Sequence, residues 1–450
     1  MSLLIKGGRV INPATKTDKE LDILVDETTG KITRIAPEIL DHTARVIDAT
    51  DKVVFPGFID MHVHMRDPGQ TYKGDIRTES KAAARGGYTT VCAMPNTTPV
   101  VDSAEGIRYV KDKAKSVGLC NVLQVGAITK GMEGKELSDI YGMANEGMIC
   151  ISEDGKSVMD SGLLRKAMKI AKEKNLTVLS HCEDINLVEG GVMNAGEKSK
   201  EFGVNGITNA VENVIIARDI MLAEETGARL HLCHCSTKES AELIRDAKAK
   251  GIFVSGEVCP HHFALSEEDI PSKEDANYKM NPPLRTKEDV EALKQGLKDG
   301  IFEVISTDHA PHSAEEKAKD FEHAPFGIVG METAASLTYS ELVLGGYLDL
   351  MQMAEKLSYN PAKILGIDAG DLSAGKPADI TIFDPDKEYE VNKKDFAGKS
   401  TNMPYEGWTL TGQVVTTIKA GKVTYEQNQR GESQKGFQKV IKTITDKLKK

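Results

Sequence analysis

The chain has 450 residues, 40% of them hydrophobic, so it can bury a large core and is long enough for one large domain and one smaller domain. Its formal net charge of -11 excludes nucleic acid and anionic membranes as expected partners, because no broad basic surface is available to neutralise phosphates. We expect small-molecule chemistry in the cytoplasm, since the sequence shows no signal-peptide pattern, no membrane-length apolar run and no paired-cysteine framework.

Short segments of alternating hydrophobic and polar residues at both ends of the chain predict one small β-sheet domain. The segments span residues 3–6, 9–11, 21–25, 31–35 and 45–48, and then 378–383, 389–391 and 413–419. Because the same pattern appears on both sides of a different middle, we expect residues 1–55 and 366–427 to form a composite β-sandwich domain.

The middle of the chain, residues 56–365, alternates apolar strand patterns with amphipathic helix patterns. The expected strands span residues 54–64, 89–94, 121–126, 148–151, 176–179, 229–233, 252–255 and 302–305. The helix patterns include residues 76–84, 104–117, 162–174, 212–226, 238–250 and 287–298. Eight such units predict an α/β fold, a (β/α)8 TIM-like barrel. The alternative is a doubly wound open sheet, but no Gly-x-Gly-x-x-Gly or phosphate-loop pattern supports its nucleotide-binding form.

The last segment, residues 428–450, is predicted to be a basic amphipathic helix. Its apolar residues at helical spacing are Phe437, Val440, Ile441, Ile444 and Leu448. We expect this helix to pack on its own subunit or on a sister subunit, and membrane docking is the weaker alternative.

The first barrel strand runs into a His-x-His pattern formed by His62 and His64. Residues at i and i+2 of a strand point to the same face, so the two imidazoles can converge on one ion. Taken alone, the pattern fits an ordinary buried pair equally well. Arg66 follows just past the strand, and a planar guanidinium is the usual partner of a carboxylate.

Active sites of such barrels lie at the C-terminal ends of the strands, so the residues that follow each strand are the functional candidates. They are His62, His64, Asn96, Asp154, His181, His234 and Asp308, with Asn281 in the loop after the seventh strand. The four histidines and two aspartates form a nitrogen and oxygen donor set suited to zinc or a similar divalent ion. Six ligands are too many for one catalytic zinc, so we expect two ions that share a bridging carboxylate.

Several segments, in order along the chain, carry a resemblance to a known family. They span residues 57–69, 83–96, 180–184, 231–236, 257–262, 279–285, 306–312 and 324–330. Gly57-Phe-Ile-Asp-Met-His-Val-His64 resembles the amidohydrolase superfamily signature, and its continuation Met65-Arg-Asp-Pro-Gly69 resembles the dihydroorotase family. The resemblance covers residues 1 to about 427, and its combination of motifs is specific.

The resemblance implies a role for each candidate residue. One zinc ion would be held by His62, His64, Asp154 and Asp308, and the other by Asp154, His181 and His234. Substrate contacts are implied for His64, Arg66, Asn96, Asn281, His312, Phe326 and Gly327. Asp308 would be the catalytic base that takes a proton from the nucleophile and returns it to the leaving nitrogen. We expect the polar segment 313–325, between two of these contacts, to be a weakly packed mobile loop.

The activity implied by the resemblance is the reversible, zinc-dependent cyclisation of N-carbamoyl-L-aspartate to dihydroorotate in pyrimidine biosynthesis. One alternative is a related cyclic amidohydrolase acting on hydantoins, dihydropyrimidines or allantoin, whose substrates lack the carboxylate that Arg66 and Asn96 would bind. Another is a catalytically silent assembly partner, but such relatives lose metal ligands that this chain keeps. We expect a homodimer, and the sequence leaves open an association with aspartate carbamoyltransferase, which some members of the resembled family show.

The bridging ligand is the point at which this chain departs from many amidohydrolases, which use a carboxylated lysine after the fourth strand. Here Glu153, Asp154 and Lys156 compete for that role. Asp154 matches the aspartate that replaces the lysine in one class I dihydroorotase subgroup, and the following Gly155 allows the close approach that a short carboxylate needs. We therefore predict that Asp154 bridges the ions and that Lys156 is solvated.

Overall fold

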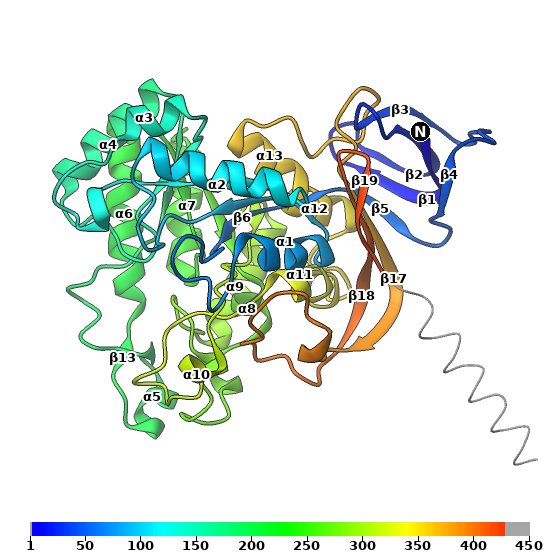
Figure 1. The fold of residues 1–450 in the computed structure, drawn as a ribbon. Helices are drawn as coiled ribbons and strands as arrows, with labels where there is room; N and C mark the ends of the chain where they lie inside the picture. The colour runs from blue at the N-terminus through cyan, green and yellow to red at the C-terminus, as the bar shows by residue number, and fades with distance from the viewer. Residues whose placement is uncertain (1, 428–450) are drawn as a thin grey trace, which may run out of the picture.

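The structure, a computed structural model, describes residues 2–427, so the helix predicted for residues 428–450 lies outside the described residues. Parallel strands form a barrel enclosed by helices (Figure 1). The strands are β6 (Phe58–Val63), β7 (Tyr88–Ala93), β8 (Asn121–Gln124) with its continuation β9 (Gly126–Ala127), β10 (Cys150–Ser152), β11 (Thr177–Ser180), β14 (Arg229–Leu232), β15 (Val254–Val258) and β16 (Val304–Ile305). The barrel closes where Val63 pairs in parallel with His309. The predicted barrel fold is confirmed.

Helices follow the barrel strands and cover their outer side. They are α1 (Ile76–Arg85), α2 (Ala104–Val117), α3 (Ile140–Asn145), α4 (Ser161–Glu173), α6 (Asn209–Thr226), α7 (Lys238–Ala249), α9 (Lys287–Lys298) and α11 (Met331–Thr338). Local signals define their starts: the Asp75 side chain accepts a hydrogen bond from Thr78 N, and the Thr286 side chain accepts one from Asp289 N. Each expected helix lies within one helical turn of its predicted position.

Shorter elements lie in the connections. They are β12 (Met193–Asn194), α5 (Glu197–Phe202), β13 (Gly206–Ile207), α8 (Pro260–Ala264), α10 (Ala314–Lys317), α12 (Leu350–Ala354) and α13 (Asn360–Leu365). Single helical turns of other types lie at Lys130–Met132, Glu267–Asp269, Ala276–Tyr278, Tyr339–Val343, Glu355–Tyr359 and Lys393–Asp395. Among the described helices, none combines the length and the apolar character needed to cross a membrane.

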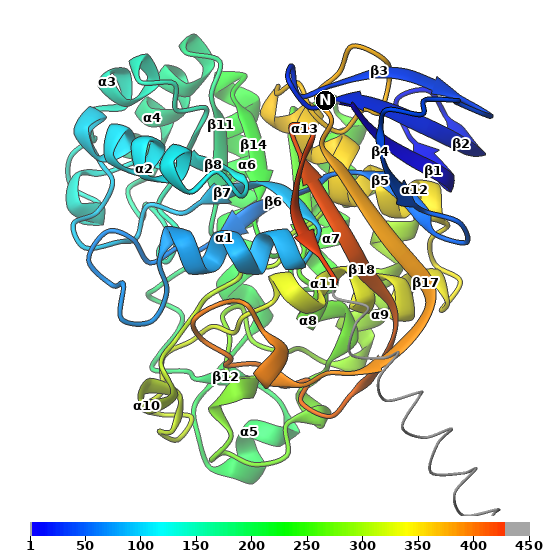
Figure 2. The same ribbon diagram turned by 45° about the vertical axis from the view of Figure 1, so that its right-hand side comes forward.

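Both ends of the chain contribute to one sheet, in which the blue N-terminal strands lie beside the orange and red C-terminal ones (Figure 2). Its order is β19-β18-β17-β5-β1-β2-β3, and β4 pairs with β1. The bounds are β1 (Ser2–Asn12), β2 (Thr17–Asp26), β3 (Lys31–Ala36), β4 (Arg45–Asp48), β5 (Val53–Pro56), β17 (Ile380–Glu390), β18 (Thr409–Lys419) and β19 (Lys422–Glu426). The two ends meet where β5 runs antiparallel to β17, with Val54 opposite Ile382. The expected composite sheet is confirmed, whereas the domain boundaries at residues 55 and 365 stay a prediction.

Candidate metal centre and substrate pocket

Six predicted ligands converge at the carboxyl ends of the barrel strands. His62 lies in β6, and the others follow their strands by one to three residues: His64, Asp154, His181, His234 and Asp308. All six side chains are buried. Because the parallel strands of a closed barrel end on one face, residues far apart in the sequence meet there.

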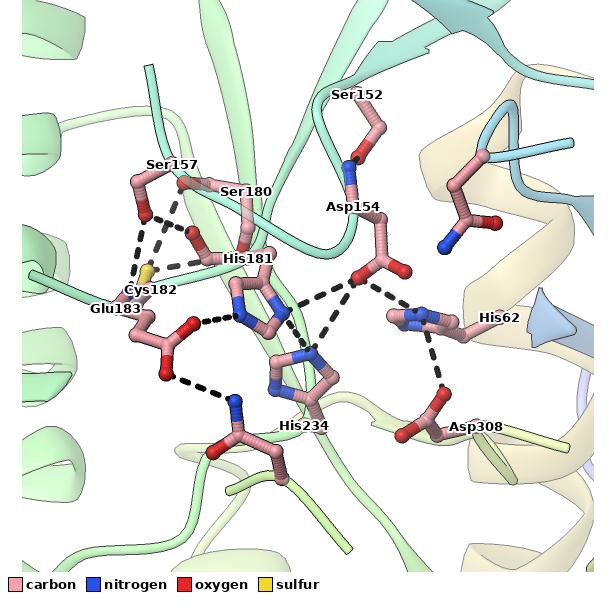
Figure 3. A network of polar contacts seen from close by, with 12 residues as sticks. His62, Ser152, Asp154, Ser157, Ser180, His181, Cys182, Glu183, His234 and Asp308 are labelled. Atoms are coloured by element: carbon pink, nitrogen blue, oxygen red, sulfur yellow. Dashed lines mark hydrogen bonds and ion pairs between the residues drawn. The ribbon is translucent and has the colours of Figure 1, made fainter. Parts of the chain in front are cut away.

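Asp154 lies at the centre of this cluster (Figure 3). Its Oδ1 is 3.1 Å from His62 Nε2, 3.3 Å from His181 Nδ1 and 3.5 Å from His234 Nε2. Its Oδ2 is 3.3 Å from His64 Nε2. A single carboxylate therefore faces imidazoles that come from three different strand ends.

Asp308 contacts the histidines of β6 from its own strand end. Its Oδ1 is 3.0 Å from His64 Nε2 and 3.5 Å from His62 Nε2. Burial alone would raise the pKa of Asp308, but its contacts with His62 and His64 lower this pKa below its ordinary value. Asp308 is therefore ionised at neutral pH, as a general base must be.

The donor atoms fit a pair of divalent ions that share one carboxylate. His62, His64 and Asp154 form one group and Asp154, His181 and His234 another, and the ligand atoms within each group lie within 4.8 Å of one another. His181 Nδ1 and His234 Nε2 are only 2.9 Å apart, so lone pairs on both would repel unless a cation lay between them. The buried His62 Nε2 and Asp154 Oδ1 have no hydrogen-bond partner within residues 2–427. This donor set suits zinc.

Glu257, at the end of β15, holds two of these histidines in place. Its Oε1 lies 3.0 Å from His62 Nδ1 and accepts a hydrogen bond of 3.2 Å from His234 N, while its Oε2 lies 2.9 Å from His231 Nε2. Burial would raise the pKa of Glu257, but the hydrogen bonds from His231 and His62 lower it well below its ordinary value. An ionised carboxylate only accepts hydrogen bonds, so His62 donates from Nδ1, and Nε2 is the nitrogen that would bind an ion in the cluster. Glu257 is not among the residues predicted from the sequence, although a charged residue inside a buried strand is a signal for it.

Two further side chains orient His64 and His181. Asn96 Oδ1 lies 2.9 Å from His64 Nδ1, and Glu183 Oε2 lies 3.2 Å from His181 Nε2. Both oxygens accept, so the ring nitrogens that face Asp154, His64 Nε2 and His181 Nδ1, are the ones that would bind an ion. Glu183 was also missed by the sequence analysis, and its only signal is its place two residues after a candidate ligand.

The structure separates the three candidates for the bridging ligand. Glu153 is buried, but its carboxylate accepts hydrogen bonds from the backbone N and the hydroxyl of Thr129 instead of facing the cluster. Lys156 is exposed, and its Nζ donates to Met132 O over 3.3 Å. Of the three, Asp154 alone reaches the histidines, in agreement with the position predicted for it.

Three candidate residues have left-handed backbone conformations. The φ angles are 60° for Arg66, 33° for His234 and 49° for Asp308. This region is costly for residues other than glycine, and such strain concentrates at functional sites. Each residue lies just past a strand end, where the unusual backbone turns the side chain inward.

A pocket opens beside the cluster. Its volume of about 210 Å³ is below the roughly 300–1,000 Å³ of sites for drug-sized ligands, so it suits a small molecule. It is lined by His64, Arg66, Asn96, Asp154, Gly155, His181, His234, Asn281, Asp308, Ala310, His312, Phe326 and Gly327. Every predicted site residue except His62 is in this lining, and His62 is fully buried.

Arg66 gives the pocket a fixed positive charge. Its Nε donates to Pro311 O over 3.0 Å, and one terminal nitrogen lies 3.2 Å from His312 Nε2. Burial lowers the pKa of Arg66 to about 10, which leaves the guanidinium charged at neutral pH. Burial, together with the Arg66 and Lys73 cations, lowers the pKa of His312 well below its ordinary value, so its ring is neutral.

The segment 313–325 is anchored at a few buried residues, and the mobility expected for it stays a prediction. Lys317 is buried, and its Nζ donates to the backbone oxygens of Lys279, Pro325 and Gly327. Lys279 Nζ donates to two further backbone oxygens of the segment, those of residues 321 and 324. The two lysines therefore hold backbone oxygens in and next to a segment whose other residues are mostly exposed or half-buried.

Comparisons with known proteins agree with this geometry. A model of the dihydro-orotase-like family matches residues 51–240. A dihydroorotase from Pelotomaculum thermopropionicum is 46% identical over 95% of this chain and 99% of its own length. Another from Citrifermentans bemidjiense is 47% identical over 95% of this chain and 100% of its own length.

Solved structures share the whole architecture. The dihydropyrimidinase from Brevibacillus agri superposes with a TM-score of 0.83 at 25% identity, and the L-hydantoinase of Arthrobacter aurescens superposes with a TM-score of 0.85 at 26% identity. Each comparison covers 95% of this chain and 96% of the other. Since the named dihydroorotases are far more similar in sequence over nearly the full length, the chain belongs to the dihydroorotase family.

Proposed function

We propose that the protein is a dihydroorotase, which reversibly cyclises N-carbamoyl-L-aspartate to dihydroorotate and water in pyrimidine biosynthesis. The observation that carries the proposal is the buried Arg66 guanidinium, which lines the same pocket as the histidine and aspartate cluster. Both substrates carry a carboxylate that takes no part in the reaction, and a planar guanidinium is its natural partner.

A related cyclic amidohydrolase is the competing function, because the similar solved structures are a dihydropyrimidinase and hydantoinases. Those proteins are 25% and 26% identical to this chain, against 45–47% for the named dihydroorotases. Dihydropyrimidines and hydantoins, the substrates in the names of those proteins, need not carry a carboxylate. A buried arginine in the pocket would then have no anionic group of the substrate to bind. Sequence and chemistry both favour dihydroorotate.

We propose two zinc ions as the cofactor. One would be held by His62, His64, Asp154 and Asp308, and the other by Asp154, His181 and His234. Bound zinc would supply Lewis acidity, polarising the ring carbonyl and lowering the pKa of the attacking water. The convergence of four imidazoles on one shared carboxylate supports this assignment.

The residues of this chain then perform the proton transfers and the positioning. In the hydrolytic direction Asp308 accepts a proton from the attacking water as the carbon–oxygen bond forms, and it delivers that proton to the ring nitrogen as the carbon–nitrogen bond breaks. In cyclisation the same carboxylate removes the ureido proton. Asn96 uses its Oδ1 on His64, so its amide N–H groups are available to join Arg66 on the substrate carboxylate.

Three contacts complete the proposed recognition of the substrate. His312, Phe326 and Gly327 would line its other side, with His312 Nε2 held 2.9 Å from Phe326 O. Asn281 would bind from the loop after β15. For the whole protein we further propose a cytoplasmic homodimer that associates with aspartate carbamoyltransferase, which size-exclusion chromatography of the two proteins together would test.

The experiment is a zinc-replete assay that compares dihydroorotate with dihydrouracil, hydantoin and allantoin. Dihydrouracil is the matched control because it is the same ring without the carboxylate. We expect turnover of dihydroorotate to exceed that of the others, with two zinc ions per subunit by elemental analysis. Preferential turnover of dihydrouracil or hydantoin would assign the protein to the competing function.

A further inference from the structure

We infer that Glu183 is a positioning residue. It contacts the candidate metal ligand His181 and orients the side-chain amide of Asn281 for substrate binding. Its Oε2 lies 3.2 Å from His181 Nε2 (Figure 3), and its Oε1 accepts a hydrogen bond of 3.0 Å from Asn281 Nδ2. Only 11% of the side chain is exposed. The inference rests on the proposed function, because Asn281 is taken to contact the substrate.

The backbone around Glu183 is fixed at the end of β11. Ser157 Oγ donates to His181 O over 2.6 Å and accepts a hydrogen bond of 3.0 Å from Glu183 N. The Ser157 hydroxyl therefore holds the backbone of both His181 and Glu183. With its main chain held, the Glu183 carboxylate has a defined position between the two side chains that it contacts.

Glu183 determines whether the oxygen or the nitrogen of the Asn281 side-chain amide points into the pocket. A carboxylate only accepts hydrogen bonds, so Asn281 must direct its NH2 group at Glu183 and leave Oδ1 for the pocket. Both forms of the proposed substrate carry N–H groups, in the ring or on the ureido group, and such a group needs an acceptor. His262 supports the loop, since its Nε2 lies 2.9 Å from Pro282 O, one residue beyond Asn281.

Glu183→Gln tests this role with almost no change in shape. The glutamine Oε1 can still accept from His181 Nε2, but its NH2 group then meets the NH2 group of Asn281. Asn281 must flip, which presents a donor where the substrate N–H needs an acceptor. We expect KM for dihydroorotate to rise about 10- to 100-fold, from the loss of one hydrogen bond in a buried site. We expect the zinc content to stay at two.

A second substitution should repair the first. Asn281→Asp alone places two carboxylates side by side and should bind substrate poorly. In the double variant Glu183→Gln with Asn281→Asp, the glutamine NH2 can donate to the carboxylate introduced at position 281, whose other oxygen again offers an acceptor to the pocket. The total charge of the pair is restored as well. We expect the double variant to have a lower KM than either single variant, which a merely structural role would not produce.

The measurements are KM and kcat for dihydroorotate, zinc content and circular dichroism, on the full chain. Glu225→Gln is the matched control, because this exposed carboxylate pairs with Arg165 on the outside of the barrel and should change nothing. An unchanged KM in Glu183→Gln, or a double variant no better than the worse single variant, overturns the inference. A folded, zinc-loaded wild type that does not turn over dihydroorotate would instead overturn the proposed function.

Discussion

Replacing Arg66 by lysine isolates the contact that distinguishes dihydroorotate from cyclic ureides without a carboxylate. Arg66 Nε donates to Pro311 O over 3.0 Å, and this anchor points the rest of the guanidinium into the pocket. Lysine keeps the positive charge, but it lacks the N–H group that donates to Pro311 O and the two parallel N–H groups that bind a carboxylate bidentately. A hydrogen bond to a charged group contributes about 1.5–3 kcal/mol, which corresponds to about a 10- to 150-fold rise in KM.

The assay measures KM for dihydroorotate and for dihydrouracil, together with zinc content, in wild type and Arg66→Lys. We expect KM to rise for dihydroorotate alone, with zinc content unchanged, because Arg66 is not a proposed metal ligand. Arg77→Lys on the exposed side of α1 is the matched control. If Arg66→Lys keeps the wild-type KM for dihydroorotate, the guanidinium does not bind the carboxylate and the argument for the substrate fails.

The remaining predictions concern the cluster itself. Asp308→Asn should lower kcat about 100- to 10,000-fold, the usual range for losing a general base, while equilibrium binding of dihydroorotate stays within a few-fold of wild type; near-normal turnover would exclude Asp308 as the base. Asp154→Ala should lose the two-metal centre by elemental analysis, whereas Lys156→Ala should keep two metals and full activity without added bicarbonate; a bicarbonate-dependent loss on changing Lys156 would contradict the assignment. Removing metal with a chelator should lower the melting temperature, and adding zinc should restore it, since an ion that binds only the folded state stabilises that state.

The regular elements of the fold were predictable because their local signals agree with their packing. Helices α2 and α9 have the bounds expected for them, since each combines an amphipathic pattern with a capping residue, Ser103 or Thr286. The pair β12 and β13 could not be predicted, because strands of two residues have no periodicity to detect. Their pairing depends on how the loop after β11 folds back, which is set by tertiary contacts.

The candidate ligands were predictable for a different reason. A histidine or aspartate just after an apolar strand is conspicuous, and the barrel fold brings all strand ends together. Glu257 was missed because its strand was expected to end at residue 255, whereas β15 runs to Val258, so a charged residue inside a buried strand was not recognised. Lys279 and Lys317 were missed because lysine is usually solvated, and only the folded chain shows backbone oxygens arranged around their ammonium groups.

The segment between β17 and β18 shows that the predicted sheet domain and barrel are not independent parts of the site. Asn402, in this segment, is buried, and its Oδ1 accepts a hydrogen bond of 3.0 Å from His312 N. Its Nδ2 donates to Ala310 O and Gly327 O over 3.2 and 3.1 Å. One amide from the C-terminal part of the chain thus holds three backbone positions of the pocket wall. A barrel cut at residue 365 would leave those buried groups unpaired, at a cost of about 1–3 kcal/mol each, so the pocket needs both ends of the chain to take its shape.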